Sequence, residues 1–117
     1  MTTIHDRESV RAFTLHTHAE CPARRAGPLS GLKCGIKDIY ETAGVRTAGQ
    51  SHLKVDHVPA VDAEAVARLR NAGAVIMGKL ATHEFATGAA TPDQPFPPAR
   101  NPWMPDRQPG GSSSGSG

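Results

Sequence analysis

The chain has 117 residues, of which 38% are apolar, and its 13 basic and 11 acidic side chains give a net charge of +2. This length fits one domain or part of one, and so small a charge argues against a nucleic acid or an anionic membrane as partner. Aromatic residues make up only 4% of the chain, so a stacking surface for single-stranded nucleic acid is not expected.

The beginning of the chain is polar. Met1 to Asp6 contain no apolar stretch of the kind found in a secretory signal, and no segment approaches the length of a membrane span. We therefore expect a cytoplasmic protein without membrane contact, in which Cys21 and Cys34 are unpaired. Residues 1–9, and in isolation also residues 105–117, are predicted to be flexible.

Two strands are predicted in the first part of the chain. Residues 10–15 alternate apolar and polar side chains, whereas residues 16–26 are ambiguous because Pro22 interrupts them. In residues 32–37 the same alternation places Leu32, Cys34 and Ile36 on one face of a second strand. The long loop that follows, 42–59, is of a length that is usually functional or mobile.

The clearest helix is predicted between residues 62 and 73. Asp62 is the expected N-cap, apolar residues at helical spacing form one stripe, and Gly73 follows the last turn. The apolar run at 74–78 predicts a strand covered on both faces and parallel to the strand at 32–37. These elements form a βαβ-type unit of the α/β class.

The last third of the chain is mainly loop. A short helix is predicted over residues 82–86, and six prolines between 89 and 108 exclude regular structure there. The composition of residues 110–117 is that of a flexible linker, but it also suits a glycine-supported turn that brings amides and a hydroxyl near a substrate. A phosphate-binding loop is not expected, because Ser116 and Gly117 occupy its lysine and Ser/Thr positions.

Lys37 is a candidate base. A lysine at the end of a strand is commonly solvated or salt-bridged, and the alternative is a side chain buried enough to lose its proton and act as a general base. Asp38 favours the charged form, so the sequence leaves both possibilities open. The six histidines show none of the spacings of a zinc site, and we expect neither a metal nor a cofactor.

Taken in order, these segments resemble the amidase signature family, which comprises hydrolases with a Ser–cisSer–Lys triad. The resemblance covers residues 10–117 and implies a mixed sheet flanked by helices, truncated here to the βαβ-type unit and loops. The matching text is GPLSGL at 27–32, GIKD at 35–38, AEAVARLRNAGAVIMG at 63–78, HEFA at 83–86, NPW at 101–103 and PGGSSSGS at 109–116.

The resemblance implies a hydrolase that acts on carboxamide C–N bonds without a cofactor. Lys37 corresponds to the catalytic lysine, and Ser112 corresponds to the serine with a cis peptide bond that relays protons. Gly110, Gly111 and Ser113 would shape the site. In the family the nucleophilic serine and the oxyanion hole come further along the sequence, so we expect residues 1–117 to be the N-terminal portion of an amidase domain that is inactive alone.

Two alternatives stay open: a non-catalytic fragment or interaction module, and a fragment of the glutaminase-like component of a tRNA-dependent amidotransferase. A small amide is the expected substrate, and the loop at 91–100 is predicted to border its entrance. A single βαβ unit leaves open sheet edges and an uncovered apolar face. The chain is therefore expected to be marginally stable, or to associate with itself or with the rest of the domain.

Overall fold

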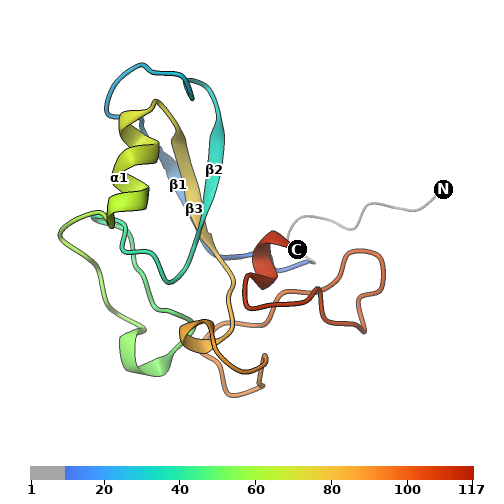
Figure 1. Ribbon diagram of the computed structural model, residues 1–117. Coiled ribbons are helices and arrows are strands. Elements are labelled where there is room, and N and C mark those ends of the chain that lie inside the picture. Colours follow the sequence, from blue (N-terminus) through green and yellow to red (C-terminus); the bar gives the residue numbers. More distant parts are fainter. Residues whose placement is uncertain (1–9) are drawn as a thin grey trace.

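The computed structural model describes residues 10–117, so the predicted flexibility of residues 1–9 lies outside it (Figure 1). Its centre is a three-stranded mixed sheet in the order β1-β3-β2, formed by β1 (Phe13–Cys21), β2 (Lys33–Lys37) and β3 (Val75–Leu80). One α-helix, α1 (Glu64–Asn71), lies between β2 and β3 in the sequence. Short 3₁₀ helices occupy His52–Lys54, Glu84–Ala86 and Ser114–Ser116.

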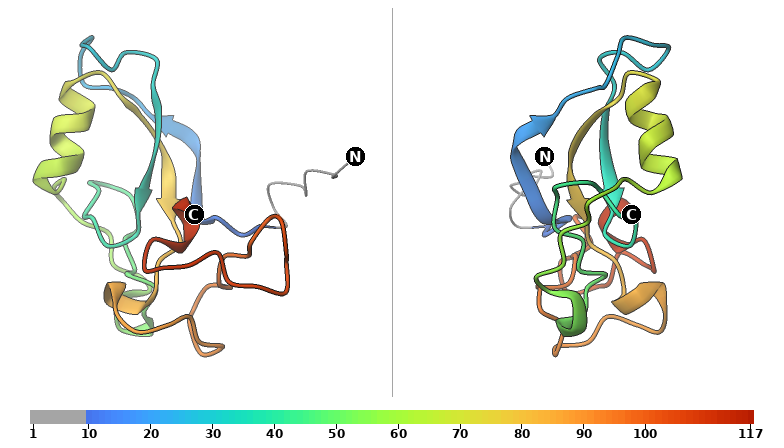
Figure 2. Two further views of the ribbon diagram at one scale, coloured as in Figure 1. Left: turned by 45° about the vertical axis from the view of Figure 1, so that its right-hand side comes forward. Right: turned by 90° about the vertical axis from the view of Figure 1, so that its left-hand side faces the viewer.

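The predicted parallel pair is confirmed. β2 and β3 run in the same direction, with Lys37 opposite Leu80, while β1 pairs with β3 in the antiparallel direction, with Phe13 opposite Leu80. The carboxyl ends of β2 and β3 therefore meet at one edge of the sheet, and the long loops gather below this edge (Figure 2). Helix α1 covers one face of the sheet (Figure 2).

Two strands run further than the sequence indicated. β1 begins at Phe13, three residues later than predicted, because residues 10 and 11 lie in a turn. It includes the ambiguous residues from His16 to Cys21 and ends just before Pro22, which has no amide proton to donate to a sheet. β3 continues beyond the predicted run through Lys79 to Leu80. Both extensions follow from pairing: β3 is the central strand, so its neighbours keep its backbone hydrogen-bonded past the apolar segment.

The predicted N-cap of the helix is wrong. Ala63 occupies that position, and no side chain caps the helix. Asp62 instead accepts hydrogen bonds from the backbone amide of Ala43 at 2.7 Å and from the guanidinium groups of Arg24 and Arg70 at 2.8 and 3.0 Å. Two arginines and a loop amide compete for the one carboxylate, so tertiary contacts override the local capping preference. Gly73 follows the helix with a φ of +101°, as predicted for a C-terminal stop.

The hydrophobic core is small. Val66 from the helix stripe packs against Ile36 and Ile76, with Cys34, Ala63 and Leu69 partly buried beside them. Ile36 and Cys34 thus face the core as the alternation predicted, whereas Leu32 is half exposed. The Cys34 thiol is free, and the side chain of Cys21 lies outside the description. Across residues 10–117, no helix has the length and apolar character to span a membrane.

Candidate active site

Lys37 and Ser112, 75 residues apart, are in direct contact. The Lys37 side-chain nitrogen donates a hydrogen bond to the Ser112 hydroxyl, with Nζ and Oγ 2.7 Å apart and both side chains half-buried. The peptide bond between Gly111 and Ser112 is cis, as the resemblance implied. The two candidate residues therefore meet where β2 ends and the C-terminal turn begins.

Backbone hydrogen bonds hold the C-terminal turn against the segment after β3. The amide of Gly115 donates to the Ala81 carbonyl at 2.9 Å, and the amide of His83 donates to the Ser112 carbonyl at 3.0 Å. Because β2 pairs with β3 to its last residue, the chain just after β3 lies beside Lys37. Gly115 has no room for a side chain, since a Cβ would lie 2.2 Å from the carbonyl oxygen of Ala12.

The three residues predicted to shape the site lie in the same turn. Gly110 has a φ of +98°, which favours glycine. Ser113 is exposed, and its carbonyl accepts from the Ser116 amide at 2.9 Å, whereas Gly111 lies against the ring of His83. Of the two possibilities that the sequence offered for this segment, a flexible linker or a glycine-supported turn, residues 110–116 thus form the turn. Flexibility of residues 105–117 in isolation stays a prediction.

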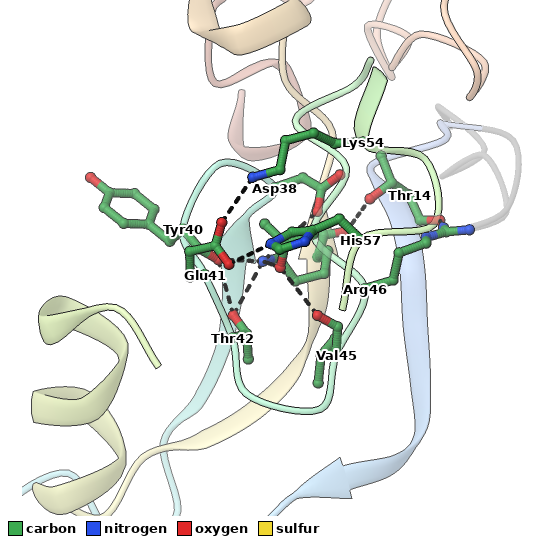
Figure 3. Close-up of polar contacts among 11 residues, drawn as sticks. Thr14, Asp38, Tyr40, Glu41, Thr42, Val45, Arg46, Lys54 and His57 are labelled. Carbon is green, nitrogen blue, oxygen red and sulfur yellow. Dashed lines mark hydrogen bonds and ion pairs between the residues drawn. The ribbon is translucent and has the colours of Figure 1, made fainter. Parts of the chain in front are cut away.

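Asp38 pairs with a lysine that the sequence analysis did not single out. Its carboxylate lies 3.8 Å from Nζ of Lys79, a side chain with no exposed surface. The same ammonium donates three hydrogen bonds into the loop after β2. Of the residues around it, Figure 3 labels Asp38, Tyr40 and Thr42. The acceptors are the Tyr40 carbonyl at 2.5 Å and the hydroxyls of Thr42 at 3.1 Å and Thr47 at 2.8 Å.

Burial dominates the electrostatics of this pair. It lowers the pKa of Lys79 from 10.5 to about 8, although the negative charge of Asp38 opposes the shift. It also raises the pKa of Asp38, against the positive charge of Lys79. A signal was present in the sequence: Lys79 continues the apolar run after Gly78, and a lysine inside a strand covered on both faces needs a partner.

A second polar cluster holds the loop between β2 and α1. Glu41 accepts hydrogen bonds from Lys54 at 2.9 Å and from the His57 ring at 2.8 Å (Figure 3). Although burial raises it, these two hydrogen bonds hold the pKa of Glu41 below its usual value. Within residues 10–117, no group of three or more His, Cys, Asp or Glu side chains is arranged to hold a metal ion.

The chain has the pattern of a known family along nearly its whole length. The model of the family described as Amidase matches residues 2–117. The chain belongs to the amidase family. Among curated amidase relatives, it is 48% identical over 111 residues to the A subunit of the glutamyl-tRNA(Gln) amidotransferase of Roseiflexus sp. (strain RS-1), covering 95% of this chain and 23% of the relative. It is 44% identical to the corresponding protein of Sulfurisphaera tokodaii, covering 98% and 24%.

Solved structures agree with this family. The structure of the A subunit of the Thermotoga maritima glutamyl-tRNA(Gln) amidotransferase matches with a TM-score of 0.82 and 37% identity, over 93% of this chain and 24% of that one. A 6-aminohexanoate cyclic dimer hydrolase matches with a TM-score of 0.70 and 32% identity, over 77% and 19%. The amidase chain thus spans about a quarter of the length of the curated relatives.

Proposed function

We propose that this chain supplies the lysine and the relay serine of an amide-hydrolysing site. The observation that carries the proposal is the hydrogen bond of 2.7 Å between Lys37 Nζ and Ser112 Oγ. The two residues stand 75 positions apart, so the fold, not the local sequence, brings an amine and a hydroxyl together. Membership of the amidase family supports C–N hydrolysis as the reaction class.

The proposed chemistry is a proton relay. A lysine acts as a base only when its amine is neutral, and it then accepts the Ser112 hydroxyl proton. Ser112 in turn removes the proton of a nucleophilic serine that attacks the carbonyl of the amide substrate. The bond from carbonyl carbon to nitrogen breaks, the amine leaves with a proton, and water releases the acyl group from the serine.

The proposal assigns the nucleophile to residues other than these 117. In the family pattern that serine follows the position of Ser112, and this chain spans about a quarter of its curated relatives. The chain alone is therefore proposed to be inactive. The rest of an amidase domain, supplied in cis or by association, would complete the site.

A second, narrower candidate concerns the substrate. The similarity to the A subunits of glutamyl-tRNA(Gln) amidotransferases, such as 50% identity over 90 residues to that of Moorella thermoacetica, favours a glutaminase-like role for the whole protein. In that case glutamine would be the amide, and partner subunits would be present. Ammonia release from glutamine compared with release from simple aliphatic amides separates this candidate from a general amidase.

The experiment joins the chain to a complete site. Residues 1–117 replace the matching segment of the Roseiflexus relative, and ammonia release is measured for this fusion and for the chain alone. We expect activity only in the fusion. Removing a proton-transfer group commonly costs about 10²–10⁴-fold in rate, so Lys37→Ala and Ser112→Ala should each lose activity on this scale. Lys33→Ala, at the other end of β2, is the matched control and should keep it.

Three results would reject the proposal. These are ammonia release by the chain alone, full activity of the fusion with Ser112→Ala, and equal losses for the Lys33 and Lys37 variants. A fusion that folds as its parent does, but releases no ammonia with any amide, would favour the non-catalytic interaction module instead.

A further inference from the structure

His83 lies against the turn that carries Ser112, and the proposed relay does not use it. It follows β3 by three residues and is only 7% exposed. This buried histidine contacts the turn through both its backbone and its ring.

The backbone contact is to Ser112 itself. The His83 amide donates to the Ser112 carbonyl at 3.0 Å, while the His83 carbonyl accepts from the Ala86 amide at 2.9 Å. The His83 backbone is therefore fixed on both sides, by the site turn and by the short 3₁₀ helix Glu84–Ala86. Because β3 places this segment, His83 ties the position of Ser112 to the sheet, beside the hydrogen bond from Gly115 to Ala81 in the same turn.

The ring contact is to the residue before Ser112. A Cβ on Gly111 would lie 2.0 Å from Cε1 and 2.2 Å from Nε2 of the His83 ring, distances at which no side chain fits. The imidazole therefore occupies the space that a side chain at position 111 would need. The backbone of Gly111 and the ring are packed directly together, so neither can move toward the other.

A third contact fixes the orientation of the ring. Nδ1 lies 2.9 Å from the carbonyl oxygen of Gly88. A carbonyl oxygen only accepts hydrogen bonds, so Nδ1 carries the proton in this contact. The ring is thus held by a hydrogen bond on one side while its Cε1–Nε2 edge packs against Gly111.

We propose that His83 is a positioning residue that keeps the Ser112 hydroxyl within hydrogen-bonding reach of Lys37. Its amide holds the Ser112 carbonyl, and its ring, anchored by Gly88, supports the backbone of Gly111. The functional meaning rests on the proposed role of the Lys37–Ser112 pair. The positioning itself is a statement about geometry and is tested without turnover.

The test measures the accessibility of Lys37 in the full chain. The four lysines are acetylated with acetic anhydride, and the rate at each is read by mass spectrometry. Lys79 reports global unfolding, because its side chain has no exposed surface, and Lys33 reports general reactivity. Ser112→Ala removes the hydrogen-bond acceptor and sets the rate expected of a released Lys37.

Four variants carry the prediction. His83→Ala should raise the rate at Lys37 toward that of Ser112→Ala, about fivefold for one lost hydrogen bond. His83→Asn should give a rate between those of the original chain and His83→Ala, because its amide nitrogen can replace Nδ1 toward Gly88 but it lacks the Cε1–Nε2 edge that packs against Gly111. Gly111→Ala should release Lys37 through the steric clash. In the double variant with His83→Ala the added methyl has room, so it should add little to the effect of His83→Ala alone.

Release of Lys37 with Lys79 still protected, partial rescue by Asn, and the missing extra effect in the double variant together support the positioning role. An unchanged Lys37 in His83→Ala overturns it. So does release of Lys37 and Lys79 in parallel, which would show that His83 acts on the fold as a whole. Either result leaves the amidase proposal intact. In the same way, an inactive fusion would leave the acetylation result for Lys37 intact.

Discussion

At the residue scale, Asp38 and Lys79 form a buried pair of opposite charges beside the candidate site. Lys79 is wholly buried, and its three hydrogen bonds end on Tyr40, Thr42 and Thr47 in the segment that follows β2. The pair therefore fixes the path of the chain as it leaves the candidate base. Buried pairs of this kind add little to stability on balance, since desolvation offsets much of their attraction.

The lowered pKa of Lys79 predicts how stability depends on pH. Below pH 8 the amine is charged in both the folded and the unfolded chain, and the cost of burying the charge is complete. Between about pH 8 and 10.5 the folded chain loses the proton while the unfolded chain keeps it, so stability rises with pH. The shift from 10.5 to about 8 corresponds to a gain on the order of 3 kcal/mol.

Lys79→Met isolates this effect, because it removes the titrating group and keeps a side chain of similar length. Urea unfolding of both proteins between pH 7 and 10 gives the difference in the free energy of unfolding. We expect the free energy of unfolding of the original chain to rise relative to that of the variant as pH rises above 8. A difference in the free energy of unfolding that does not change with pH, or that changes in favour of the variant, would show that the burial of Lys79 does not control stability between pH 8 and 10.

The sequence could predict the candidate residues but not their surroundings. Lys37 and Ser112 follow from motifs that occur in a fixed order, each with a chemical reason for its residues. His83 acts through contacts with segments distant in the chain, which no local pattern marks. The place of Lys79 inside a buried strand indicated that it needs a partner, but not which one. The partner of Asp38 is missed for the same reason: adjacency in sequence points to Lys37, whereas its carboxylate pairs with Lys79 on the neighbouring strand.

At the element scale, the elements with a clear periodicity were predicted correctly, whereas the boundaries of the helix and of β1 were not. The helix stripe, the parallel pair and the stop at Gly73 depend on local spacing or on a general rule of βαβ units. The helix start moved because Asp62 is used by two arginines, and β1 lengthened because pairing with β3 outweighs its weak alternation. Tertiary contacts decided both boundaries.

The loop predicted to border the substrate entrance is fastened by Gln50. This fully buried side chain donates hydrogen bonds to the Phe96 carbonyl at 2.7 Å and to the Gln94 side chain at 3.3 Å. Arg46 adds a contact, with its guanidinium 4.2 Å from the centre of the Phe96 ring. The loop after β2, which Lys79 anchors, therefore also holds residues 94–96 in place.

Gln50→Ala should loosen this loop. We expect trypsin to cleave after the exposed Arg100 several times faster in the variant, because local opening then costs one or two hydrogen bonds less. Val58→Ala, an exposed position in the same long loop, serves as the control. Equal cleavage rates in Gln50→Ala and in the original chain would show that the loop is held elsewhere.

At the scale of the whole molecule, the apolar surface is only partly covered. Within residues 10–117, β1 and β2 are the two edges of the sheet, and the buried apolar cluster is small. Several large apolar side chains are mostly exposed, among them Leu53, Val61 and Trp103 at 85%, 72% and 79%. Such surfaces are suited to contact with another protein segment, which is also what the open sheet edges led us to expect from the sequence.

We accordingly predict that the isolated chain is marginally stable or self-associates. Light scattering together with circular dichroism should show either a broad, low thermal transition or a mass above that of one 12.3 kDa chain. A cooperative transition of a monomeric chain would contradict the prediction and would indicate that these elements suffice as an independent domain.

The central claim, that Lys37 and Ser112 act as one proton-transfer unit, is tested most directly by a double-mutant cycle on ammonia release by the fusion. Residues that work as a unit are strongly non-additive, because the second removal takes away little that the first has left. The double variant Lys37→Ala with Ser112→Ala should therefore be no slower than the slower single variant. Losses that multiply in the double variant would contradict the claim.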